Sequence, residues 1–121
     1  MSDYVDSFYS RTIAEPGARP ALEGAIETET CVIGGGLAGL ATALDLAERG
    51  RSVVLLEANR IGWGASGRNG GFMSPGFATG VSGLIEKVGR HKAREMYALS
   101  KMGHALVRDR ISAYQIDCGP I

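Results

Sequence analysis

The stretch TCVIGGGLAGL, residues 30–40, decides the fold of this chain. It holds a short apolar run, then Gly34-x-Gly36-x-x-Gly39, then the first residues of a helix-forming segment. An apolar strand, a glycine-rich turn and a helix in this order form the phosphate-binding corner of dinucleotide-binding folds. The three glycines permit, in turn, a tight bend, close approach of a diphosphate and close packing of helix on strand. The free amides that begin the helix would face the anion.

The residues around this stretch predict one βαβ unit. We expect a strand over residues 29–33, a helix over 37–49 and a second strand over 52–57. The continuous run VVLL in the second strand favours a parallel strand covered on both faces. The predicted fold class is therefore α/β, with a Rossmann-like unit. Helical spacing predicts one apolar face of the helix, made of Leu37, Leu40, Ala41, Leu44 and Ala47.

An acidic residue, Glu57, ends the second strand. It follows Gly34 at close to the spacing of about 20 residues at which such folds place the acid that binds a ribose. A carboxylate accepts hydrogen bonds from ribose hydroxyls and repels a 2′-phosphate. This pattern disfavours NADP and leaves NAD and FAD both open.

The next segment, EANRIGWGASGRNGG over residues 57–71, resembles the second flavin-contacting stretch of the D-amino-acid-oxidase-like (DAO) FAD-dependent oxidoreductases. The resemblance covers essentially the whole chain, is most specific over residues 31–71, and is greatest to the gamma-glutamylputrescine oxidase group. It implies FAD as cofactor. It also implies an amine or amino acid as substrate, an imine as product and oxygen as acceptor. Some members attach flavin through a histidine where this chain has Arg68, so non-covalent FAD is expected.

The resemblance also implies the cofactor contacts, residue by residue, while it assigns no catalytic residue. Those expected to face the pyrophosphate are Gly34, Gly35, Gly36, Leu37 and Gly39. Those expected at the adenosine end are Glu57, Asn59 and Arg60. Those expected along a phosphate oxygen and the ribityl chain are Ser66, Arg68, Asn69, Gly70 and Gly71.

The chain is expected to fall into three parts. Residues 1–28 form an extended arm with one short helical turn, and residues 29–81 form the FAD-binding βαβ unit with its glycine-rich flavin loop. Residues 82–121 form a helical segment that leads into a truncated substrate domain. Two parallel strands leave a doubly wound sheet incomplete, and members of the family are longer, so the chain is interpreted as an N-terminal fragment.

Within the last part we expect a short helix over residues 82–88 and a long helix over 90–114. A further strand is expected from Ile116. The apolar seam of the long helix is predicted at Met96, Leu99, Gly103, Leu106 and Ile111.

Composition limits the classes of partner. The chain has 121 residues, with 13 basic and 13 acidic side chains, so no nucleic-acid or membrane partner is indicated. Two cysteines make no disulfide framework; Cys31 is expected to be a small buried residue, and a cytoplasmic location is expected. His91 and His104 lie 13 residues apart with no nearby cluster of acids or thiols, so no metal site is predicted. Two alternatives stay open, an NAD-binding dehydrogenase module and a non-catalytic truncated fragment, and the oligomeric state is undetermined.

Overall fold

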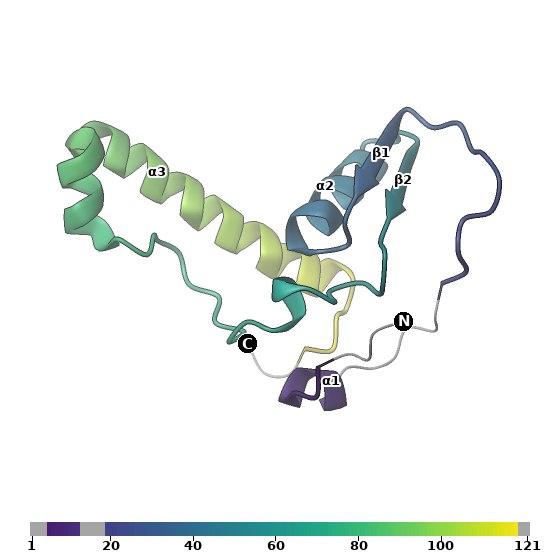
Figure 1. The fold of residues 1–121 in the computed structure, drawn as a ribbon. Helices are drawn as coiled ribbons and strands as arrows, with labels where there is room; N and C mark the ends of the chain where they lie inside the picture. The colour runs from purple at the N-terminus through teal and green to yellow at the C-terminus, as the bar shows by residue number, and fades with distance from the viewer. Residues whose placement is uncertain (1–4, 13–18, 119–121) are drawn as a thin grey trace. The chain divides into compact units, whose positions relative to one another are not determined.

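The computed structural model describes residues 5–12 and 19–118. The chain divides into two compact units, with the boundary along the sequence between Gly70 and Gly71. The first unit holds α1 (Phe8–Thr12), β1 (Thr30–Ile33), α2 (Leu37–Glu48), β2 (Val53–Leu56) and the 3₁₀ turn η1 (Ala65–Gly67). The second holds α3 (Gly80–Ala113). Figure 1 shows these elements with their labels.

The two strands run parallel, and α2 connects them. Thr30 lies opposite Val53 and Ile33 lies opposite Leu56. The helix α2 packs on both strands, as Figure 1 shows. The α/β class and the βαβ order predicted from the sequence are confirmed, and the sheet in the described residues has two strands.

Close packing at Gly39 fixes how α2 lies on the sheet. A Cβ at this position would overlap the carbonyl oxygen of Gly34 and would lie 3.4 Å from Cγ1 of Val32. Ala43 and Leu46, which follow Gly39 at i+4 and i+7, are half-buried. The glycine therefore determines which side of α2 faces β1.

The predicted apolar face of α2 was wrong in part. Leu37, Leu40 and Ala47 are exposed, while Ala41 and Leu44 are half-buried. The helix is apolar on nearly all sides, so periodicity could not single out the side that meets the sheet. The side that meets the sheet is determined by Gly39, which has no side chain where α2 approaches β1 most closely.

The two strands differ in burial, since β2 is half-buried along its whole length whereas β1 is not. Burial alternates along β1: Thr30 and Val32 are half-buried, whereas Cys31 and Ile33 are exposed, Ile33 by 85%. All four residues of β2 are half-buried. The prediction that Cys31 is buried was therefore wrong, since Cys31 is exposed.

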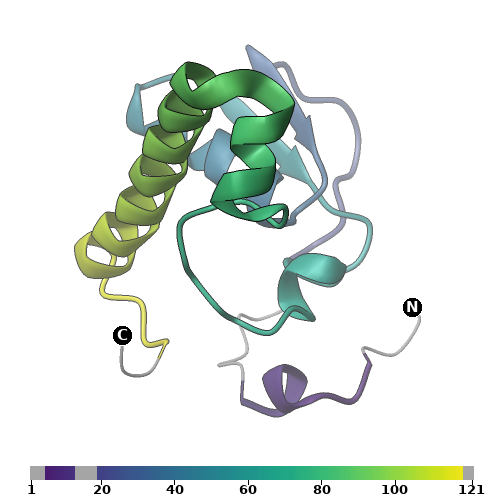
Figure 2. The same ribbon diagram turned by 90° about the vertical axis from the view of Figure 1, so that its left-hand side faces the viewer.

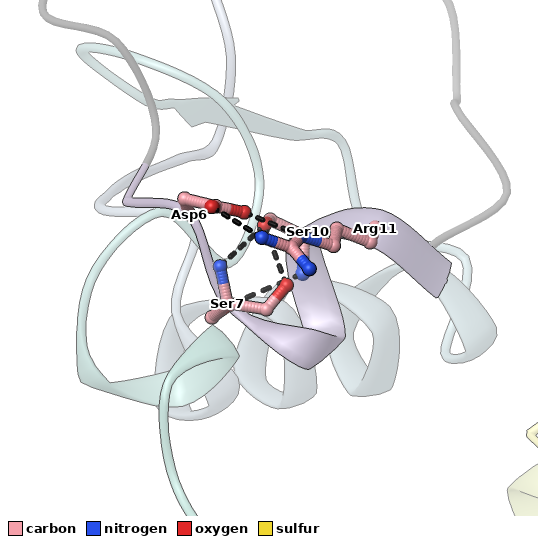
Figure 3. A network of polar contacts seen from close by, with 4 residues as sticks. All are labelled: Asp6, Ser7, Ser10 and Arg11. Carbon is pink, nitrogen blue, oxygen red and sulfur yellow. Dashed lines mark hydrogen bonds and ion pairs between the residues drawn. The ribbon is translucent and has the colours of Figure 1, made fainter.

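The short helix α1 is held by its own polar side chains, as Figure 3 shows. The amide of Ser10 donates to Oγ of Ser7, and the amide of Ser7 donates to Oγ of Ser10, a reciprocal capping arrangement. The guanidinium of Arg11 donates to the carboxylate of Asp6, with Nε and Oδ1 2.6 Å apart. These local contacts explain the single helical turn that the sequence predicted in the arm.

The long helix α3 is two helical segments joined at Gly89. This residue has φ 79° and ψ 158°, which is not helical. Figures 1 and 2 show α3 changing direction part-way along its length. Leu84 before the bend and Ala93 after it are the buried apolar residues of the described chain. The break agrees with the predicted pair of helices over 82–88 and 90–114.

The predicted seam of the second segment was displaced. Leu99, Gly103 and Leu106 are exposed. The half-buried residues after Ala93 are Met96, Ser100, His104, Val107, Arg110 and Ile111. Because this stripe includes the polar residues Ser100, His104 and Arg110, apolar periodicity does not predict it. The strand expected from Ile116 does not appear in residues 116–118, and residues 119–121 lie outside the described part.

None of the helices in residues 5–12 and 19–118 combines the length and apolar character that crossing a bilayer requires.

The bend at Gly89 gives a test with a control in the same helix. Gly89→Ala is expected to lower the free energy of unfolding by about 1–3 kcal/mol, because φ near +79° is strained for a residue with a Cβ. Gly103→Ala, whose Cβ would meet open space, is expected to raise it by about 0.5–1 kcal/mol. Urea denaturation followed by circular dichroism measures both. Equal effects of the two substitutions would show that the bend carries no strain.

Candidate cofactor site

The glycine turn lies where β1 ends and α2 begins. Gly34 has φ 103°, a conformation that favours glycine, and its amide donates to the carbonyl oxygen of Leu56 at 2.7 Å. Gly36 is the N-cap of α2, in extended conformation, with no side chain to cap the helix. The amide of Gly36 has no hydrogen-bond partner among the described residues. The turn thus offers an unpaired donor at a helix N-terminus, where anions bind well.

The carboxylate of Glu57 reaches back from the end of β2 to this turn. The amide of Gly35 donates to its Oε2 at 2.6 Å, and the amide of Asn59 donates to its Oε1 at 3.0 Å. The amide of Gly35, then that of Asn59, favours the ionised form and lowers the pKa of Glu57 below 4.5, with a smaller contribution from Ala58 and partial desolvation acting the other way. Each oxygen keeps a lone pair for a further donor, such as a ribose hydroxyl.

Gly35 is buried beneath the segment that follows Glu57. A Cβ on Gly35 would lie 2.7 Å from Cδ1 of Ile61 and 3.1 Å from Oε2 of Glu57. The carbonyl oxygen of Gly35 accepts a hydrogen bond from the amide of Gly62 at 2.9 Å. Gly35 therefore serves chiefly to hold the acid and the following loop against the turn.

Ser66 closes the other side of the turn. The amide of Leu37, the first residue of α2, donates to Oγ of Ser66 at 2.8 Å. A Cβ on Gly36 would lie 3.1 Å from the same oxygen. A hydroxyl 29 residues along the chain from Leu37 thus caps α2, which its own N-cap glycine does not do.

Arg68 and Asn69 hold the loop that carries Ser66. Nε of Arg68 donates to the carbonyl oxygens of Trp63 and Gly64, and the guanidinium lies 4.7 Å from the centre of the Trp63 ring. Nδ2 of Asn69 donates to the carbonyl oxygen of Ser66 at 2.8 Å. In this structure both side chains turn back onto their own loop.

Apart from Arg68 and Asn69, the predicted site residues divide into three groups. The structure brings together the turn residues, Glu57 and Ser66, joined through the contacts above. Asn59 contributes its amide to Glu57, and Arg60 is half-buried and accepts from the amide of Trp63. Gly70 ends the first unit and Gly71 begins the second, so the role of both stays a prediction.

Sequence reasoning missed two residues of this region. Ile61 covers Gly35, and Trp63 stacks under Arg68 while its buried indole N–H lacks a hydrogen-bond partner among the described residues. The sequence does indicate these two residues, because they are large apolar side chains on either side of Gly62 in a loop of otherwise mostly small residues. No group of three metal-ligating side chains occurs in the part of the chain that the structure describes.

Residues 29–120 match the family model described as "FAD dependent oxidoreductase", DAO. The chain belongs to this family. The match includes the βαβ unit, the glycine turn, Glu57 and the loop with Ser66. The family resemblance inferred from the sequence motifs is thereby confirmed.

Several curated relatives are similar over nearly the whole chain. "Gamma-glutamylputrescine oxidoreductase" of Escherichia coli K12 is 39% identical over 98% of this chain and 28% of its own length. "Probable oxidoreductase OrdL" of Haemophilus influenzae is 38% identical over 96% of this chain and 27% of its own. The protein of that name from Rhizobium meliloti is 34% identical over 92% and 26%, respectively. This chain therefore spans about a quarter of the length of these relatives. No solved structure matches it.

The residues present fit the family's cofactor. The diphosphate of FAD needs donors without a Cβ in the way, and the unpaired amide of Gly36 and the start of α2 supply them. The hydroxyl of Ser66 accepts from Leu37 through its oxygen, so its proton is available to a phosphate oxygen. The carboxylate of Glu57 has acceptor capacity left for the adenosine ribose.

Packing at Gly39 gives a stability test. Gly39→Ala is expected to lower the free energy of unfolding by about 1–3 kcal/mol, because its methyl group would overlap the carbonyl oxygen of Gly34 and force α2 away from β1. The matched control is Gly64→Ala, whose Cβ would meet open space, with an expected change within about 0.5 kcal/mol. Chemical denaturation measures both. An unchanged Gly39→Ala variant would mean that the strand and helix do not approach as described.

The titration of Glu57 tests its contacts with the turn. We expect its carboxyl carbon, followed by ¹³C NMR, to titrate with a midpoint below 4.5, because Gly35 and Asn59 favour the ionised form. A depressed pKa in the folded state means that these contacts stabilise the fold above pH 4.5 and that this contribution is lost as the pH falls through the folded pKa. Glu57→Gln, which lacks the titrating group, identifies the signal. A midpoint at or above 4.5 would rule out the contacts.

Proposed function

We propose that this chain is the FAD-binding N-terminal portion of a flavin-dependent oxidoreductase that oxidises an amine or an amino acid. The observation that best supports this proposal is the hydrogen bond from the amide of Gly35 to the carboxylate of Glu57. It holds an acid suited to bind a ribose beside a helix N-terminus that has an unpaired donor. Family membership selects FAD over NAD as the dinucleotide.

The proposed contacts follow the order of groups along FAD. Glu57 binds the adenosine ribose, with Asn59 and Arg60 on the adenine side. The turn residues, Leu37 and Ser66 bind the diphosphate. Arg68, Asn69, Gly70 and Gly71 belong to the stretch that passes along the ribityl chain, where Arg68 and Asn69 act mainly by fixing the loop backbone.

When bound, FAD supplies the acceptor for the two electrons that leave the substrate carbon. The part played by these residues is to bind and orient the cofactor through charge, backbone donors and the absence of side chains at the turn. FAD is bound non-covalently, because this chain has Arg68 at the position where some members of the family attach flavin through a histidine. It names no catalytic base among these residues.

Similarity to the Escherichia coli relative makes γ-glutamylputrescine the first substrate to try, with the imine as product and oxygen as acceptor. The two cysteines, both free, accord with a reducing, cytoplasmic setting. Balanced charge and the absence of a nucleic-acid or membrane signal leave a small molecule as the expected partner.

Titration of FAD into the chain tests the cofactor assignment. We expect the fluorescence of FAD to change with saturation, and NAD to compete poorly. Glu57→Gln is expected to weaken FAD binding by roughly 10-fold or more, since it replaces a charged acceptor with an amide.

The matched control is Glu29→Gln. Oε2 of Glu29 accepts from the amide of Ser52 at 2.8 Å, a carboxylate–amide contact at the opposite end of the same sheet. This variant is expected to bind FAD like the unaltered chain. Tighter binding of NAD than of FAD would support the dehydrogenase alternative, and no binding of either would support the non-catalytic one.

A further inference from the structure

Two segments that lie far apart in the sequence are joined by one hydroxyl group and by one backbone hydrogen bond. Oγ of Ser66, on the 3₁₀ turn η1, accepts from the amide of Leu37 at the start of α2. Further along the loop, Gly62 donates to the carbonyl oxygen of Gly35. The first contact is through a side chain, and the second is between backbone groups.

The loop around Ser66 is braced on both sides of that residue. Arg68 holds the carbonyl oxygens of Trp63 and Gly64, and Asn69 holds that of Ser66 itself. These contacts hold the loop in one shape. The hydroxyl of Ser66 then fixes the position of the loop against the glycine turn. Gly36 leaves just enough room, because a Cβ there would come within 3.1 Å of the hydroxyl oxygen.

We infer that Ser66 is a positioning residue that docks the flavin-side loop on the N-terminus of α2 before the cofactor arrives. The inference rests on the proposed function and goes beyond it, because it assigns Ser66 an effect on the flavin half of FAD in addition to any contact with a phosphate. Loss of the hydroxyl releases the loop, and the cofactor must then order it on binding.

A comparison of FAD with ADP separates positioning from a direct phosphate contact. Both ligands carry the adenosine and the diphosphate, and only FAD extends along the loop. Ser66→Ala is expected to weaken FAD by roughly 2- to 30-fold, the range for loss of a helix cap. The binding of ADP is expected to weaken by a clearly smaller factor, because ADP loses only the phosphate contact of Ser66, and Ser66→Thr, which keeps the hydroxyl, should restore FAD binding. Ser52→Ala, at the far end of the sheet, is the control.

A second route displaces the hydroxyl without removing it. Gly36→Ala places a methyl group against Oγ of Ser66 and is expected to reduce the protection of the Leu37 amide from hydrogen exchange in the free chain, as Ser66→Ala does. In a double-mutant cycle on this protection, Gly36→Ala should add little to Ser66→Ala, because both remove the same contact. Fully additive losses would overturn the inference.

A measurement on the free chain tests the contact itself. Hydrogen exchange of the Leu37 amide, followed by NMR, should be faster in Ser66→Ala than in the unaltered chain and should be slowed again in Ser66→Thr. Equal exchange in all three would overturn the inference, as would equal weakening of FAD and ADP or no weakening of either. If the unaltered chain binds no FAD, the proposed function fails, while the exchange rates still decide whether Ser66 holds the loop.

Discussion

The hydrogen bond from the amide of Gly35 to the carboxylate of Glu57 is the contact on which the rest of the first unit depends. It links the turn after β1 to the end of β2, where the backbone ladder of the two strands stops with Gly34. Because the donor is a main-chain amide, the acid is held in a fixed place relative to the start of α2. The same contact keeps the carboxylate ionised, which is the state in which it accepts hydrogen bonds best.

Two glycines of the motif act here on protein atoms as much as on a ligand. Gly39 is required by the carbonyl oxygen of Gly34, and a Cβ on Gly36 would lie in a tight contact, 3.1 Å from the hydroxyl oxygen of Ser66. A phosphate would take up donors beside groups that the protein already packs together. These contacts join protein groups to one another, so forming them does not require the cofactor, which lowers the ordering cost that binding must overcome.

The sequence was sufficient for features that depend on near neighbours. The turn at Gly34, the strand and helix order and the acid at Glu57 follow from spacing within one βαβ unit, and the structure has them. The exposed side of α2 could not be predicted, because a helix that is apolar all round takes its orientation from the closest contact, at Gly39. The contact of Ser66 with Leu37 could not be predicted either, since no periodicity relates residues 29 positions apart.

Both units have large apolar side chains that are exposed. Ile33 on β1 and Leu99, Met102 and Leu106 on α3 are exposed, and the last three follow helical spacing along one side. A parallel strand is ordinarily covered on both faces, and an apolar helical stripe ordinarily has a neighbour. The contacts described above for the glycine turn lie within residues 32–69 of the first unit.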